Sequence, residues 1–214
     1  MKLSTNTDFE NSNDIVSEGF SIGMSQVKSE VEEFYNYAYN VHGSNGSNFM
    51  EIGTKQGGNF NGLCHIYNGH KISVDLVGGP YGGWATNEHP YMGNIVSKRD
   101  KYFRSNFKNV HMIHGNSRYV STRLQIEKIL GNKKLVLLYI DGDHTYEGVK
   151  ADFEFYKDLV HKNGMIVFHD INDSVHHRDI GVEVGKFWKE VEGTKKEFNA
   201  GKHWAGIGVL TQWK

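Results

Sequence analysis

Five side chains that could bind a cation follow two apolar segments of the sequence: Asp141, Asp143 and His144 after residues 135–140, and His169 and Asp170 after residues 165–168. If these segments are neighbouring parallel strands, they lie ~4.8 Å apart, and their carboxyl ends share the sheet edge where open α/β sheets bind ligands. Asp141 and Asp170 could then converge on one ion, with His169 or Asp143 nearby. Mostly oxygen ligands suit a hard divalent cation. The alternative is that Asp141 and Asp143 only cap the next helix, but two clusters on consecutive strands favour a site.

A glycine-rich segment and a distant acid indicate an adenosine-containing cofactor. Residues 51–58 include several glycines, which let a backbone approach a ligand closely. Asp75 follows about two dozen residues later, where a carboxylate can accept hydrogen bonds from ribose hydroxyls. The glycine spacing is not G-x-G-x-x-G, and Glu51 would repel a pyrophosphate but could receive a sulfonium or an amino group. The segment therefore favours S-adenosylmethionine over NAD.

Helices and strands must alternate to bring these groups to one sheet edge. Apolar periodicity predicts strands at 47–53, 71–75, 110–114, 135–140 and 165–168, helices at 25–41, 60–67, 95–107, 122–130, 146–161 and 182–191, and a closing antiparallel pair at 196–199 and 207–211. Asn163-Gly164 is expected to end a helix, and residues 77–90 to form a long loop. This order predicts an α/β fold, with a parallel sheet covered by helices on both faces.

Composition limits the classes of function. The 214 residues predict one domain at 25–214 after a loose, polar leader at 1–24. A net charge of -1 gives no global positive field for nucleic acid, and no apolar run approaches the ~20 residues of a membrane span. The lone Cys64 is expected in the core. We expect a cytoplasmic protein, and we assign no role to His176, His177 and the scattered histidines.

The segments 139–152 and 163–170 together carry a family resemblance. With YIDGDHTYEGVKAD and NGMIVFHD, the chain resembles the class I S-adenosylmethionine-dependent methyltransferases, in the branch similar to cephalosporin hydroxylase-like and macrocin O-methyltransferase-like proteins. The resemblance covers roughly residues 47–211. It implies a Rossmann-like, doubly wound sheet of seven strands, mostly parallel with a reversed last strand.

The resemblance also implies roles for individual residues. Residues that would hold S-adenosylmethionine are Glu51, Gly53, Gly57, Asp75, Asn116 at the adenine, and Asp141. The metal ligands would be Asp141, His169 and Asp170, with Mg or Mn as the ion, since an imidazole widens the choice toward manganese. Lys55 departs from the family pattern, because it stands where the commoner motif has its middle glycine.

These residues predict in-line methyl transfer to a hydroxyl that the metal binds and acidifies. His144 is the first candidate for general base, and Asp143 is the alternative. The acceptor is expected to be a small molecule or a sugar or glycan hydroxyl, with Tyr81, Trp84 and Tyr91 as candidate stacking residues. The chain could also form a homo-oligomer. Two other hypotheses are an NAD-dependent oxidoreductase and a non-catalytic cofactor-binding module.

Overall fold

The computed structural model describes residues 12–43, 46–77, 92–201 and 204–213. The helices are α1 (Ser12–Ile22), α2 (Lys28–His42), α3 (Gly58–Ile66), α4 (Met92–Asn106), α5 (Val120–Leu130), α6 (Tyr146–Tyr156), α7 (Val175–Asp179), α8 (Val184–Glu190) and the 3-10 turn η1 (Lys157–Leu159). The strands are β1 (Asn48–Ile52), β2 (Lys71–Asp75), β3 (Val110–His114), β4 (Leu135–Ile140), β5 (Val160–His169), β6 (Thr194–Phe198) and β7 (Ile207–Thr211). β2, β3 and β4 have the bounds that the sequence predicts.

The strands form one seven-stranded sheet in the order β3-β2-β1-β4-β5-β7-β6. All pairs from β3 to β5 are parallel, while β7 runs antiparallel to both β5 and β6. The predicted mostly parallel sheet with a reversed last strand is therefore confirmed. Strand order reverses between β1 and β4, and a crevice forms at such a reversal in open α/β sheets.

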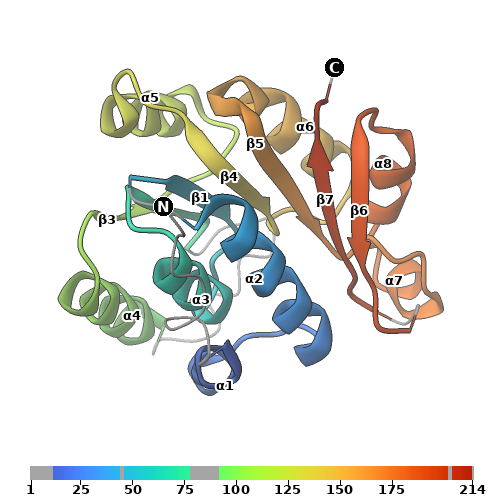
Figure 1. Cartoon of the computed structure of the whole chain (residues 1–214), viewed down its shortest axis with the longest axis horizontal. Coiled ribbons are helices and arrows are strands. Elements are labelled where there is room, and N and C mark those ends of the chain that lie inside the picture. Colours follow the sequence, from blue (N-terminus) through green and yellow to red (C-terminus); the bar gives the residue numbers. More distant parts are fainter. Residues whose placement is uncertain (1–11, 44–45, 78–91, 202–203, 214) are drawn as a thin grey trace, which may run out of the picture.

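Helices cover both faces of the sheet, as Figure 1 shows. On one face, α5, α6 and α8 pack against alternate sheet residues such as Leu138 and Ile140. On the other face, α2, α3 and α4 pack against intervening residues such as Leu137 and Tyr139. Because β4 is covered on both faces, its nearly continuous apolar sequence is that of a central parallel strand.

The structure differs from the sequence prediction in the leader, because Ser12–Ile22 form helix α1. Val16 is fully buried in the core beside α2 and α3, so this part of the leader is not loose. The boundary at residue 24 stays a prediction. Cys64 is buried, as expected.

The helix predicted at 146–161 is too long. It ends at Tyr156 and passes through η1 into β5, which begins at Val160. Asn163-Gly164 lies inside this strand, next to an irregularity in its pairing with β4, and does not end a helix. The short helix α7 was not predicted. Among the described residues, none of the helices combines the length and apolar character that crossing a bilayer requires.

Candidate active site

A cavity of about 460 Å³ opens where β1, β2, β4 and β5 end. Nine of the residues predicted to form the site line it: Glu51, Gly53, Asp75, Asn116, Asp141, Asp143, His144, His169 and Asp170. Among the described residues that were predicted to bind the donor or the metal or to act as a base, Gly57 is the one outside this lining. The fold thus brings the expected donor residues and the expected cation ligands to one place at the strand reversal.

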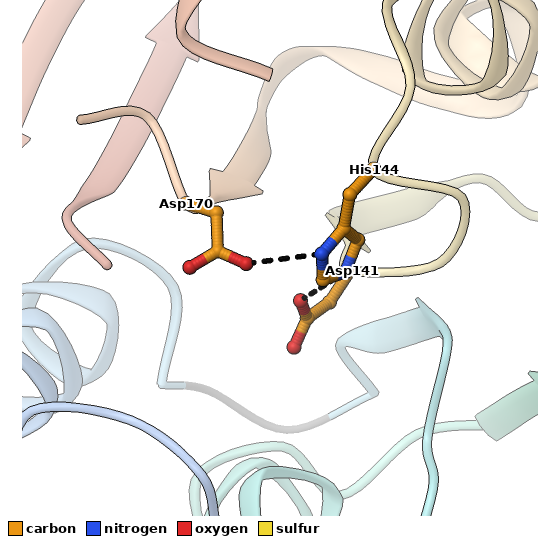
Figure 2. Close-up of side chains that lie close together, drawn as sticks. All are labelled: Asp141, His144 and Asp170. Atoms are coloured by element: carbon orange, nitrogen blue, oxygen red, sulfur yellow. Dashed lines mark ion pairs between the residues drawn. The ribbon is translucent and has the colours of Figure 1, made fainter. Parts of the chain in front are cut away.

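Asp141, His144 and Asp170 form a compact cluster of potential metal ligands. One ligand atom from each lies within 4.8 Å of the others. Figure 2 shows the His144 ring between the two carboxylates, with Nε2 3.4 Å from Asp141 Oδ1 and Nδ1 3.2 Å from Asp170 Oδ2. Two carboxylates and an imidazole suit Mg²⁺ or Mn²⁺. The donor set therefore fits the predicted type of ion.

His169 lies between the same two acids from the interior side. Its Nδ1 is 3.2 Å from Asp141 Oδ1 and 3.2 Å from Asp170 Oδ1, and its side chain is 3% exposed. Its buried Nε2 has no hydrogen-bond partner among the described residues. His169 as metal ligand stays a prediction, because the geometry adds His144 as a second candidate for the imidazole ligand.

The four charged groups perturb one another strongly. Burial alone would raise the pKa of Asp141 and of Asp170, but the neighbouring His169 and His144 hold both below their ordinary values. Burial alone would lower the pKa of His169, but the two carboxylates raise it well above its usual range. The His144 pKa is raised for the same reason. The carboxylates therefore favour the protonated form of both imidazoles, and the imidazoles favour the ionised form of both carboxylates.

Local backbone structure fixes the cluster. Ile140 pairs with Phe168, so Asp141 and His169 leave adjacent strand ends side by side. Asp170 has φ 62, a left-handed conformation that an aspartate adopts at a cost and that is concentrated at functional sites. The strained turn aims the carboxylate of Asp170 back toward β4.

Asp143 supports the start of α6, although Thr145 and not Asp143 is the N-cap that the alternative interpretation expected. Its Oδ1 accepts hydrogen bonds from the backbone N–H (3.0 Å) and hydroxyl (2.8 Å) of Thr145, the N-cap of α6. Its Oδ2 pairs with Arg118 at 2.9 Å. Both oxygens are thus engaged, which makes Asp143 a weaker candidate for general base.

The glycine loop between β1 and α3 has an unusual backbone. Gly53 has φ 88, and a Cβ there would overlap the carbonyl of Asp141, so this glycine allows β1 and β4 to approach each other. Gly57 has φ 98, and a Cβ there would press on the Phe103 ring. Lys55 has φ 51, the left-handed conformation that favours glycine. Lys55 therefore adopts the left-handed backbone conformation that a glycine at this position of the family motif would adopt without strain.

Glu51 is a buried acid in the wall of the cavity, among the residues predicted to bind the methyl donor. Its side-chain Oε1 accepts a hydrogen bond from Asn59 Nδ2 at 2.6 Å, whereas Oε2 has no partner among the described residues. Burial raises its pKa from 4.5 to about 8, and the Asp141 and Asp75 carboxylates contribute to the rise. Such a group can meet a cationic amino group by losing its proton.

Asp75 lies at the tip of β2 and is 6% exposed. Its Oδ2 forms an ion pair of 2.7 Å with Arg99, a residue that we did not single out from the sequence. Asn116 also lines the cavity, and its Oδ1 accepts from the backbone N–H of Arg118 at 2.9 Å.

Other cavity residues also escaped the sequence analysis. His177, to which we assigned no role, is buried and lines the cavity, with Nε2 3.5 Å from Asp170 Oδ1 and Nδ1 2.6 Å from the Asn172 carbonyl. His176, Ile180 and Trp204 also line it. The position of the pair His176-His177, shortly after His169-Asp170 in the sequence, could have indicated that His177 lies near the site. The predicted stacking residues Tyr81, Trp84 and Tyr91 lie outside the described residues.

Comparison with known families identifies the fold. A family model described as a methyltransferase domain matches residues 50–171, more than half of the chain. The chain belongs to this methyltransferase family. The match begins in β1 of this methyltransferase and ends just after Asp170, so it contains both halves of the cavity. The predicted membership of the class I methyltransferases is confirmed.

Solved structures share the fold of this methyltransferase at low sequence identity. The O-methyltransferase from Bacillus cereus in complex with SAH has a TM-score of 0.56 at 16% identity, with 98% of this chain and 92% of that chain covered. TomG from Streptomyces achromogenes, in complex with SAM, has a TM-score of 0.57 at 14% identity, covering 99% and 92%. MycE of the mycinamycin biosynthetic pathway, in complex with Mg, SAH and mycinamycin VI, has a TM-score of 0.59 at 13% identity, covering 97% and 56%.

Two curated relatives of this methyltransferase carry no functional name. Uncharacterized protein y4gI from Sinorhizobium fredii is 23% identical over 171 residues, 79% of this chain and 18% of that protein. Uncharacterized protein R132 from Acanthamoeba polyphaga mimivirus is 37% identical over 59 residues, 28% of this chain and 27% of that protein. These matches cover less than a third of either relative.

Proposed function

We propose that this chain is a metal-dependent O-methyltransferase that transfers the methyl group of S-adenosylmethionine to a hydroxyl group of a small molecule or a sugar. The observation that carries the proposal is that one cavity contains both Glu51 and Asp75 and, at the adjoining strand ends, the Asp141, His144 and Asp170 cluster. The fold neighbours crystallised with SAH or SAM, and MycE with Mg, support the same assignment.

The chain's own residues would divide the work between two halves of the cavity. Glu51 would receive the amino group of the donor, and Asp75 would accept hydrogen bonds from its ribose. Asp141 and Asp170, with one imidazole, would hold the divalent ion. When bound, that ion supplies the positive charge that lowers the pKa of the acceptor hydroxyl. The transfer forms an O–CH₃ bond, breaks the S–CH₃ bond, and passes the hydroxyl proton to a base.

His144 has two candidate roles that exclude each other. It is 35% exposed, lines the cavity and contacts both acids, so it could bind the ion or accept the hydroxyl proton. A histidine ligand sets the metal affinity, whereas a histidine base sets the pH dependence of the rate. If His144 is the ligand, His144→Ala lowers Mn²⁺ affinity; if it is the base, that variant binds Mn²⁺ normally and loses methyl transfer.

Apolar side chains at the cavity mouth support an organic acceptor. Trp204 and Ile180 line the cavity and are 38% and 59% exposed. An exposed indole can stack on a sugar or an aromatic ring. We propose this surface as the acceptor side of the cavity. A homo-oligomer and a cytoplasmic location remain parts of the proposal.

A matched pair of aspartates tests the metal role. Asp170→Ala should abolish tight Mn²⁺ binding and metal-stimulated methyl transfer while S-adenosylhomocysteine still binds. Asp173→Ala is the control, because this exposed residue three positions later forms ion pairs with Arg178 and Lys189 on the protein surface. Unchanged Mn²⁺ affinity in Asp170→Ala would exclude the proposed site. Stabilisation of the protein by NAD but not by S-adenosylhomocysteine would instead favour an oxidoreductase, which the family membership disfavours.

A further inference from the structure

The guanidinium group of Arg99 joins the two backbone segments that form the donor half of the cavity. Arg99 lies on α4, and its side chain is 2% exposed. Its Nη1 donates a hydrogen bond of 2.7 Å to Asp75 Oδ2 and one of 2.6 Å to the carbonyl of Lys55 in the glycine loop. Asp75 and Lys55 are among the described residues that line the cavity, and Arg99 is not. Arg99 therefore contacts these two lining residues from outside the cavity.

A second acid holds the other side of the guanidinium. Arg99 Nε donates to Asp100 Oδ1 at 3.1 Å, and the Asp100 side chain is 7% exposed. Asp100 Oδ2 in turn lies 2.8 Å from His114 Nε2 at the end of β3. Since the guanidinium is planar and rigid, contacts on both sides fix its orientation, and with it the orientation of the Asp75 carboxylate.

Electrostatics explains why the donor half needs this cation. A buried carboxylate is costly unless it is paired, and Asp75 shares the cavity with Glu51 and Asp141. Arg99 places a positive charge against Asp75, which it shares with Asp100, and it is not among the residues that line the cavity. A carboxylate has about four lone-pair sites, so Asp75 can accept from Arg99 and from a ligand at the same time.

We propose that Arg99 is a positioning residue of the donor site, which orients Asp75 and the Lys55 carbonyl for the ribose of an adenosyl cofactor. This inference rests on the proposed function, because it assumes that Asp75 binds ribose hydroxyls. A preoriented carboxylate increases affinity, since the ligand does not have to order it on binding. Loss of Arg99 should therefore weaken recognition of the ribose specifically.

Isothermal titration with two ligands separates positioning from general loosening of the fold. The ligands are S-adenosylhomocysteine and its 2′,3′-dideoxy counterpart, which lacks the hydroxyls that Asp75 would bind. Arg99→Gln should weaken S-adenosylhomocysteine binding about 10- to 100-fold, as expected for hydrogen bonds to a charged group, and change dideoxy binding by less than about threefold. Asp75→Asn should show the same pattern. The variant that combines Arg99→Gln and Asp75→Asn should bind S-adenosylhomocysteine no more weakly than the weaker-binding of the two single variants.

Arg104→Gln is the matched control. Arg104 lies on the same helix and pairs with Asp100 at 3.7 Å, but its side chain is 59% exposed. This variant should bind both ligands like the wild type. If Arg99→Gln does not fold, Arg99→Lys takes its place. Lysine keeps the positive charge but lacks the several N–H donors of the planar guanidinium, so this variant should lose less affinity for S-adenosylhomocysteine, again with little change for the dideoxy ligand.

The outcomes distinguish this inference from the proposed function. A folded Arg99 variant with wild-type affinity for S-adenosylhomocysteine would overturn the inference, as would an equal loss for both ligands. The inference would also be overturned if the fold-loss of affinity in the double variant equalled the product of the two single losses, because the two residues would then act independently. If the wild-type protein itself does not bind S-adenosylhomocysteine, the proposed function fails, whatever Arg99 does.

Discussion

Replacing Glu51 by glutamine removes a buried acid whose ionisation opposes folding. Glu51 is 1% exposed, and burial raises its pKa from 4.5 to about 8. In the unfolded chain the same carboxyl group titrates near its ordinary value. Between these two values, the folded protein binds one more proton than the unfolded chain. Linkage then requires that the free energy of unfolding falls as the pH rises through this range.

The size of the effect follows from the two pKa values. At about 1.4 kcal/mol per pKa unit, the rise from 4.5 to about 8 corresponds to about 5 kcal/mol of stability that is present below pH 4.5 and lost by pH 8. Glutamine can keep the hydrogen bond from Asn59 and does not titrate. Glu51→Gln should therefore gain several kcal/mol relative to the wild type as the pH rises.

Urea unfolding of both proteins between pH 4.5 and 8.5 measures this difference. Asp152, whose pKa burial raises to about 6, is present in both proteins, so its contribution cancels. We expect the two stability curves to converge near pH 4.5 and to separate steadily above it. Parallel curves would refute the conclusion that Glu51 retains its proton in the folded protein.

Ligand binding offers a second measurement on the same carboxyl group. An ammonium group beside Glu51 favours its ionised form. Binding of S-adenosylhomocysteine at pH 7 should therefore release close to one proton in the wild type and none in Glu51→Gln. Titrations in buffers of different ionisation enthalpy measure this number. Equal proton release by both proteins would show that the amino group does not meet Glu51.

Three further predictions concern the framework of the site. Gly53→Ala should cost several kcal/mol of stability, because its Cβ would overlap a backbone carbonyl, whereas Gly46→Ala, at a similar φ of 84 with nothing within 4 Å, should cost only about 1 kcal/mol in urea unfolding. Val16→Asp should lower the melting temperature by 10 °C or more, which corresponds to a loss on the order of several kcal/mol in the free energy of unfolding. Asn13→Asp, at an exposed position of the same helix, should leave the melting temperature unchanged. Equal melting temperatures for both variants would show that α1 is dispensable. Asp143→Ala should lower the free energy of unfolding by about 1 kcal/mol and leave Mn²⁺ affinity unchanged; lost affinity would give Asp143 a role at the ion.

The sequence predicts those parts of the fold that depend on local pattern. β4 is apolar throughout because helices cover both of its faces, and its bounds were predicted correctly. The end of α6 was not predicted correctly, because Val160 continues an apolar pattern that is compatible with a helix and with a strand. Helix α1 was not predicted, because the leader around it is rich in Asn, Ser, Thr and Asp and only a few apolar side chains, such as Val16, mark its buried face.

The candidate site was predictable where its residues follow strand ends. Asp141 and Asp170 stand directly after two neighbouring strands, so the sheet rule was sufficient to bring them together. Arg99 could not be found in this way, because its contact with Asp75 joins a helix to a strand tip 24 residues away. The ring of His144 between both acids likewise depends on the conformation of the loop after β4.

The proposed reaction requires that a divalent ion and an adenosyl donor share this one cavity. Anomalous diffraction at the manganese edge, from crystals grown with Mn²⁺ and S-adenosylhomocysteine, tests it directly. We expect a manganese peak within coordinating distance of carboxylate oxygens of Asp141 and Asp170, with the ligand's ribose at Asp75. A peak away from both aspartates, no peak at saturating Mn²⁺, or a ligand bound outside the cavity would contradict it.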